Sequence, residues 1–261
     1  MVQSLSLIRL QAPRLLLIAA LLQLLLYLTR VPIVGFLIML SVPLFTAGIL
    51  EAFHVTASGG RPRLGMLFSP LSSPDRAGRL LGLGAVLFVA GILTVVLVLA
   101  GAEGTVSQEL LVRLEQGDLQ AISELDQGVL ARMVAALAIG VAVSGTLSYF
   151  AIPMIWFGRS RLGRSLAGGV RALLVNWRPF TVLALGLAAL LLPIMLAVGV
   201  LMVVAAAGGV AAILATAFIV VLLLAFQMLL FGTQYCSYQD VFGPVGMGPR
   251  PPSDEDGQLL A

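Results

Sequence analysis

Residues 179–235 read PFTVLALGLAALLLPIMLAVGVLMVVAAAGGVAAILATAFIVVLLLAFQMLLFGTQY, and no charged residue occurs between Arg178 and Asp240. A helix needs about 20 apolar residues to cross the hydrocarbon core of a bilayer, so this interval is long enough for two crossings. The run AAAGG at 205–209 interrupts the stretch with small residues. The stretch therefore predicts two membrane-spanning helices, at about 179–204 and 209–235, joined by a tight turn.

Four further apolar stretches precede this pair, and each has a length that suits a membrane span. We place them at about 14–29, 32–54, 79–101 and 132–157. Of the 261 residues, 60% are hydrophobic and 10% are charged, whereas a soluble domain carries about 25% charged residues. The sequence thus predicts an all-α, polytopic membrane protein with six transmembrane helices.

All fifteen basic residues are arginines, and their positions alternate along the chain. Only Arg30, Arg113 and Arg132 lie in or beside the second and fourth hydrophilic segments. The others lie in the first, third, fifth and last segments, at Arg9, Arg14, Arg61, Arg63, Arg76, Arg79, Arg159, Arg161, Arg164, Arg171, Arg178 and Arg250. Because arginine-rich loops stay in the cytoplasm, we predict a bacterial inner-membrane protein with cytoplasmic N- and C-termini.

The hydrophilic segments suggest one membrane domain, residues 1–240, with two inserts and a tail. Residues 102–131 carry six acidic residues and apolar residues at helical spacing, so we expect a periplasmic amphipathic insert there. Residues 159–178 carry five arginines, no acid and a separate apolar stripe, which predicts a cytoplasmic interfacial helix. Residues 241–261 are rich in proline and glycine and are expected to form a disordered cytoplasmic tail.

The ends of the even-numbered spans resemble one another. They read PLFTAG at 43–48, PMIWFG at 153–158 and QMLLFG at 227–232. This similarity suggests three successive helical hairpins built on one plan, with Pro43 and Pro153 bending equivalent helices. The general frequency of proline and glycine in membrane helices would produce the same pattern without a repeat.

The net charge of +3 does not indicate a nucleic-acid partner, because the arginines lie beside apolar spans and no basic soluble domain accompanies them. Anionic lipid head groups are the partner that this placement favours. The single cysteine, Cys236, excludes an intramolecular disulfide, and the sequence contains no metal or cofactor fingerprint. We therefore predict no cofactor.

Several short motifs resemble a family of uncharacterised bacterial multi-pass inner-membrane proteins. They are PLFTAG at 43–48, GRP at 60–62, LF at 67–68, NWRPF at 176–180 and YCSYQDVFG at 235–243. That family is distantly similar to the membrane domains attached to some glycerophosphodiester phosphodiesterases. The resemblance implies a six-helix membrane fold and no biochemical activity. We do not expect the hydrolase activity of those enzymes, since their soluble catalytic domain is not among these residues.

Few polar side chains fall within the spans. Glu51 and His54 share one face of a helix, and Glu-x-x-His is a ligand pair of di-metal bundles. Such a site needs further carboxylates, so we interpret the pair as the polar end of a span. Ser144, Ser148 and Gln227 are candidates for a polar lining, although helix-to-helix hydrogen bonds explain them equally well.

These observations favour a protein that is not an enzyme, because convergent acids, bases and nucleophiles are missing from the sequence. We expect a scaffold or accessory protein that contacts lipids or a membrane-protein partner. The alternative is a transporter or flippase for a small or lipidic substrate, with proline-bent helices as its moving parts. Lipid phosphates are expected to contact Arg159, Arg161, Arg164, Arg171 and Arg178, because the guanidinium fork suits phosphate oxygens.

Overall fold

The computed structural model describes residues 2–99, 113 and 127–245, and every regular element in these residues is helical. The helices are α1 (Val2–Tyr27), η1 (Leu28–Arg30), α2 (Pro32–Ala57), η2 (Leu64–Ser72), α3 (Pro74–Leu99), α6 (Gln127–Ser148), α7 (Ala151–Trp156), α8 (Leu162–Val175), α9 (Trp177–Ala206) and α10 (Gly209–Phe242), of which η1 and η2 are 3₁₀ helices. The predicted all-α class is confirmed. Most of the predicted insert at 102–131, and most of the predicted tail at 241–261, lie outside the described residues.

Six helical segments are long and apolar enough to cross a bilayer, which confirms a multi-pass membrane protein. They are Ser4–Arg30, Ile33–Ala57, Pro74–Leu97, Gln127–Trp156, Trp177–Ala206 and Gly209–Phe242. The first differs most from its predicted bounds of about 14–29. Helix α1 consists of two helical segments joined by a kink at Gln11, where φ is −139°, two residues before Pro13. A proline removes one helical hydrogen bond and clashes with the preceding turn, which explains a kink at this place.

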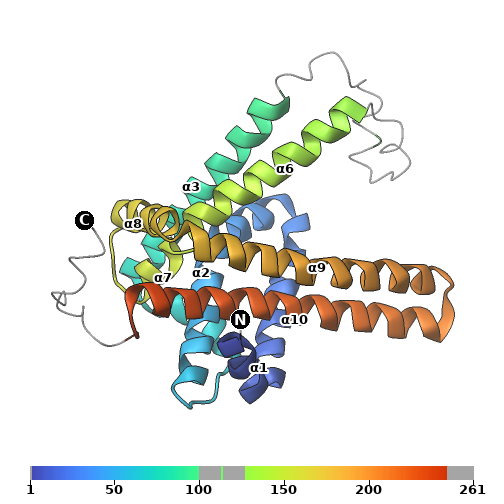
Figure 1. Ribbon diagram of the computed structural model, residues 1–261, viewed down its shortest axis with the longest axis horizontal. Coiled ribbons are helices and arrows are strands. Elements are labelled where there is room, and N and C mark those ends of the chain that lie inside the picture. The colour runs from blue at the N-terminus through green and yellow to red at the C-terminus, as the bar shows by residue number, and fades with distance from the viewer. Residues whose placement is uncertain (1, 100–112, 114–126, 246–261) are drawn as a thin grey trace.

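The spans form three successive hairpins, α1/α2, α3/α6 and α9/α10 (Figure 1). The predicted turn between the last two spans is confirmed, because Gly208 and Gly209 adopt φ values of 79° and 68° that favour glycine. The hairpins differ in detail. Helix α2 continues through Pro43, whereas α6 ends at Ser148 and Pro153 lies in the separate short helix α7.

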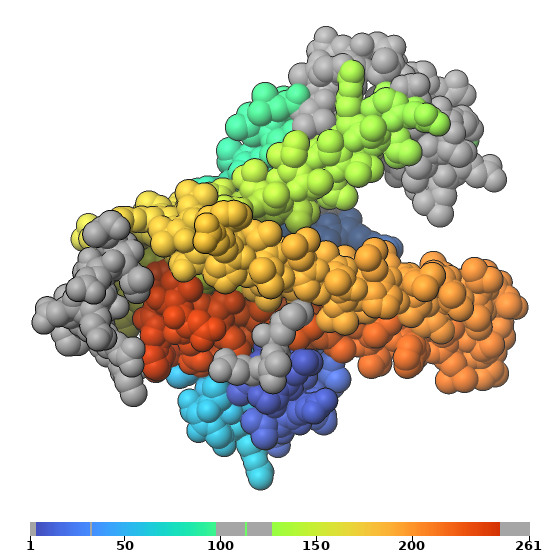
Figure 2. Space-filling view, in the orientation of Figure 1, coloured from blue at the N-terminus to red at the C-terminus, as the bar shows by residue number. Residues whose placement is uncertain are grey.

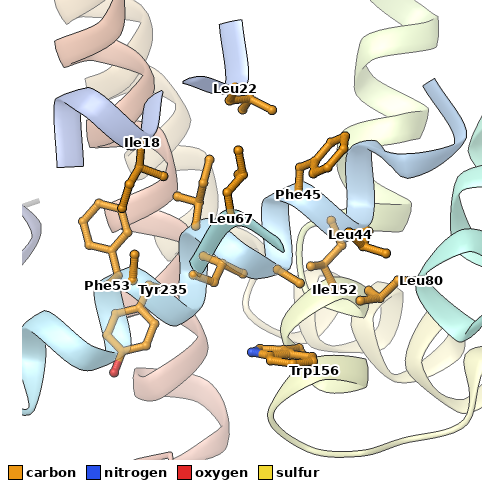
Figure 3. Close-up of a cluster of buried hydrophobic side chains, with 14 of the residues drawn as sticks. Ile18, Leu22, Leu44, Phe45, Phe53, Leu67, Leu80, Ile152, Trp156 and Tyr235 are labelled. Carbon is orange, nitrogen blue, oxygen red and sulfur yellow. The ribbon is translucent and has the colours of Figure 1, made fainter. Parts of the chain in front are cut away.

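The buried core lies at one end of the molecule, where the hairpins meet. Figure 3 shows Ile18 and Leu22 of α1, Leu44, Phe45 and Phe53 of α2, Leu67 of η2, Leu80 of α3, Ile152 and Trp156 of α7, and Tyr235 of α10. The α3/α6 and α9/α10 hairpins diverge from this end, and their far ends stay apart in Figure 2. Helix α9 packs mainly along α10 and has no buried residue, as expected of an apolar helix at the lipid-facing side of a bundle.

The segment between the first two hairpins folds back into this core. Leu67 of η2 is fully buried and lies between α1 and α2 in Figure 3. Gly48 permits this approach, because a Cβ atom there would lie 2.6 Å from the Met66 carbonyl oxygen. We infer that η2 is an integral part of the helical bundle.

The predicted interfacial helix at 159–178 corresponds to α8 and the first turn of α9. Helix α8 is shorter than the predicted segment, and Trp177 and Arg178 begin α9. Leu162 and Leu166 pack against the core, while Ser165 and Gly169 are buried. The apolar stripe of α8 therefore contacts protein over its first half. This packing holds the helix across the junction of α3, α6 and α7.

Candidate anion-binding site at the start of α3

Two segments that are 80 residues apart in the sequence form a basic cavity of about 350 Å³. The cavity is lined by Ser73, Pro74, Asp75, Arg76, Arg79 and Arg159. Ser73 directly precedes α3, the next four belong to its first turns, and Arg159 lies in the connection between α7 and α8. The site thus lies between the start of α3 in the second hairpin and the loop between α7 and α8.

The start of α3 has the features of a helix N-terminus. The Ser73 carbonyl oxygen accepts hydrogen bonds from the backbone N–H groups of Arg76 and Ala77, at 3.0 and 2.9 Å. Pro74 suits the first helical position because it has no N–H group to leave unpaired. Asp75 lies in the first turn, where the helix dipole favours a negative charge. These local preferences begin α3 at Pro74, so its first turn lines the cavity.

Arg76 is held in place by three contacts. Its guanidinium stacks on the Trp156 ring, 4.2 Å from the ring centroid. Nη1 donates to the Trp156 carbonyl oxygen at 3.2 Å, and Nη2 donates to Ser73 Oγ at 2.8 Å. The side chain is half-buried, so it loses little freedom when it binds a further acceptor.

The Arg79 side chain bonds α3 to the loop between α7 and α8. Its Nη1 atom donates to the carbonyl oxygens of Arg159 and Ser160, at 2.9 and 3.3 Å. Arg159 has a φ of 51°, and no other non-glycine residue in the described part of the chain has a positive φ. A non-glycine residue in this conformation costs on the order of 1 kcal/mol or more, and such residues cluster at functional sites.

Positive charge dominates the cavity. Three guanidinium groups line it against the single carboxylate of Asp75. Among the described residues, no ion pair neutralises Asp75, and no hydrogen bond or ion pair engages the Arg159 side chain. Guanidinium groups with open donors bind the oxygens of phosphate and carboxylate groups. The arrangement therefore suits a small anion with several oxygen atoms.

Of the five arginines that the sequence indicated for lipid phosphates, only Arg159 lines this cavity. Arg161, Arg164, Arg171 and Arg178 are exposed outside it. Sequence reasoning missed Arg76 and Arg79 as site residues and treated them only as markers of a cytoplasmic loop. The pair Ser73–Pro74 is a pattern that could have indicated a helix start, whereas the predicted span began only at about residue 79. No pattern along the chain could show that residue 159 lies beside that start.

Glu51 and His54 lie elsewhere, where the ends of α2, α7 and α10 meet. Trp156 Nε1 donates to Glu51 Oε2 at 2.8 Å. His54 Nδ1 lies 3.1 Å from Tyr235 Oη, which also accepts from Gln239 Nε2 at 2.6 Å. Each side chain thus has an interhelical partner. The described residues contain no group of three histidine, cysteine or acidic side chains that could hold a metal ion.

The polar side chains that the sequence indicated as a lining are dispersed. Gln227 accepts from Gln23 Nε2 at 2.9 Å and thereby connects α10 to α1. Ser148 Oγ donates to the Ser144 carbonyl oxygen at 2.6 Å, within α6. Ser144 itself borders a groove of about 580 Å³ between α2, α3 and α6. Most side chains along that groove are apolar, among them Val42, Leu87, Phe88, Ile92 and Leu137.

Comparisons with models of protein families, with curated proteins and with solved structures find no match to this chain. The resemblance to the bacterial membrane-protein family therefore stays a prediction from the sequence.

Proposed function

We propose that this multi-pass membrane protein is a scaffold or accessory protein of the bacterial inner membrane that works by contact with anionic lipids and a membrane-protein partner, without catalysis. The observation that carries the proposal is the charged face of α8. Arg161, Arg164 and Arg171 are exposed, while Leu162 and Leu166 on the opposite side pack into the bundle. A helix fixed in this way presents its cations to the membrane surface.

The arrangement of the hairpins supports cytoplasmic termini. The start of α3, helix α8 and the C-terminal end of α10 gather at one end of the molecule (Figure 1). The turn at Gly208 and the far ends of α3 and α6 point away from that end. This end carries Arg76 and Arg79 at the start of α3 and Arg161, Arg164 and Arg171 on α8, and the positive-inside rule assigns such an end to the cytoplasm.

Reporter fusions test this orientation directly. Fusions after Gly60, Gly168 and the C-terminus should give cytoplasmic reporter activity, because arginine-rich loops resist translocation. A fusion after Gln116 should give periplasmic activity and serves as the internal control. A periplasmic signal from the Gly168 or C-terminal fusion would overturn the orientation.

Native mass spectrometry tests the lipid contact. The wild-type protein, purified with equal amounts of phosphatidylglycerol and phosphatidylcholine, should retain phosphatidylglycerol preferentially. The variant Arg161→Gln/Arg164→Gln/Arg171→Gln should retain between about ten- and a hundredfold less at low salt, since each basic residue near an anionic surface contributes about 1 kcal/mol. The difference should shrink as salt rises.

A matched pair of variants separates a lipid site from general loss of charge. Arg164→Gln/Arg171→Gln removes two charges from α8, and Arg61→Gln/Arg63→Gln removes two from another exposed segment. Only the first pair should reduce retention. Equal retention by the wild type and the α8 variants would leave these arginines with a role in topology alone.

A transporter or flippase is the second candidate, and the groove that reaches Ser144 is the observation in its favour. The apolar lining suits a lipid chain better than a polar solute. The hydrogen bonds of Glu51, His54 and Gln227 to neighbouring helices support the scaffold instead, because they give these polar groups a packing role. Accelerated lipid exchange between leaflets in proteoliposomes of the wild type would favour the flippase.

A further inference from the structure

We infer that the cavity formed by Arg76, Arg79 and Arg159 is a binding site for a phosphate group. The inference goes beyond the proposed lipid contact, because the cavity uses residues other than the exposed arginines of α8. The phosphate group belongs either to a lipid head group or to a soluble phosphate ester. Both present the same tetrahedral oxygens to the three guanidinium groups.

The available donors support this inference. Arg76 and Arg79 each direct part of the guanidinium to a carbonyl oxygen of the 156–160 segment, which fixes the position of the planar group. A guanidinium carries more N–H donors than these contacts use. The Arg159 guanidinium has no hydrogen bond or ion pair among the described residues. Several donors therefore remain for the oxygens of one bound group.

The backbone at Arg159 is a second, independent observation. A φ of 51° is a conformation that glycine adopts far more readily than arginine. The Arg159 carbonyl oxygen in this conformation accepts from Arg79, and the side chain lines the cavity. A residue retained in a strained conformation, with its charge in a cavity, is typical of a ligand contact.

Asp75 gives a further test, because its replacement should change the affinity for phosphate in the opposite direction to the replacement of an arginine. Its carboxylate lines the same cavity and repels a bound anion. Asp75→Asn should therefore strengthen phosphate binding, whereas loss of an arginine should weaken it. A site for a cation would respond in the reverse direction to both changes.

The experiment measures binding to the purified full chain by isothermal titration calorimetry and native mass spectrometry. The probes are inorganic phosphate, glycerol 3-phosphate, and mixed micelles that contain either phosphatidate or phosphatidylcholine. Arg79→Gln and Arg159→Gln should each weaken binding of the phosphate probes about tenfold or more, as expected when a charge-assisted hydrogen bond is lost.

Two further variants separate binding from folding. Arg159→Gly removes the charge and also relieves the backbone strain, so it should lose binding while the thermal unfolding midpoint is kept or raised. Arg63→Gln removes the same charge from an exposed position outside the cavity and should bind like the wild type. All variants are compared by size-exclusion profile before titration.

Each outcome decides the matter. Binding of inorganic phosphate or glycerol 3-phosphate that the cavity variants lose assigns a soluble phosphate ester. Binding confined to phosphatidate and lost in the same variants assigns a lipid head group. Equal loss in Arg63→Gln and Arg79→Gln, or no binding of any phosphate probe by the wild type, overturns the site. If lipid retention falls only in the variant Arg161→Gln/Arg164→Gln/Arg171→Gln, the phosphate site in the cavity is refuted while the proposed function stands.

Discussion

Gly84→Leu should abolish the folded state, because α2 and α3 touch at this glycine. A Cβ atom at position 84 would overlap the backbone carbonyl oxygen of Leu40. A backbone atom cannot move aside as a flexible side chain does, so the two helices would have to separate. Overpacking costs about 1–3 kcal/mol where side chains adjust, and a larger loss is expected here. Thermal unfolding in detergent, followed by size-exclusion chromatography, measures the effect.

Gly91→Leu is the matched control on the same helix. An added Cβ at Gly91 would meet no heavy atom within 4 Å beyond the neighbouring backbone of its own helix, because this glycine borders the apolar groove. Replacement of an interior helical glycine improves helix propensity by up to about 1 kcal/mol. The control should therefore keep or raise the unfolding midpoint. Similar midpoints for both variants would show that α2 and α3 do not approach each other as described.

Trp156→Phe should lower the free energy of unfolding by about 2–4 kcal/mol. Two effects contribute, the loss of a hydrogen bond to Glu51 and a weaker stacking contact with Arg76. The Trp156 side chain is buried, and its Nε1–H group is the donor to Glu51 Oε2. Phenylalanine leaves the carboxylate of Glu51 without that donor, and an unsatisfied charged acceptor is costly. It also provides a smaller aromatic surface for the Arg76 guanidinium to stack on.

Glu51→Gln separates the two effects. The glutamine amide oxygen can still accept from Trp156 Nε1, so this variant should lose about 1 kcal/mol or less. In the double variant the losses should not add, since Trp156→Phe removes the donor and Glu51→Gln removes the negative charge that would be left without it. The double-mutant cycle should give a coupling of about 1 kcal/mol or more. A coupling near zero would mean that the Glu51 carboxylate does not depend on the Trp156 donor for its stabilisation.

The number of spans could be predicted from the sequence because transfer of a helix into lipid depends on its own length and apolarity. The run from 179 to 235 shows this most clearly, since it predicted both α9 and α10 and the Gly208–Gly209 turn. The bounds were less certain where polar residues lie inside a helix. Arg9 and Arg14 suggested a late start for the first span, yet α1 begins at Val2.

The places where helices meet could not be predicted in this way. Glu51 and His54 were identified as a polar pair, but their partners Trp156 and Tyr235 come from other hairpins. Leu67 lies between the second and third predicted spans, and the structure buries it in the core. These contacts depend on which helices pack together, and packing in membranes rests on close approach at small residues such as Gly48 and Gly84.

The sequence alone therefore determined the all-α membrane class, the six spans and the segments that carry positive charge, because each is a property of a continuous stretch of chain. Only the tertiary structure decided that Arg159 joins Arg76 and Arg79 around one cavity. The physical reason is that the charge of a site is the sum over all side chains that surround it, and these come from segments that are distant in the sequence. The packing of α7 against α3 brings the 157–161 connection to the start of α3, across 80 residues of sequence.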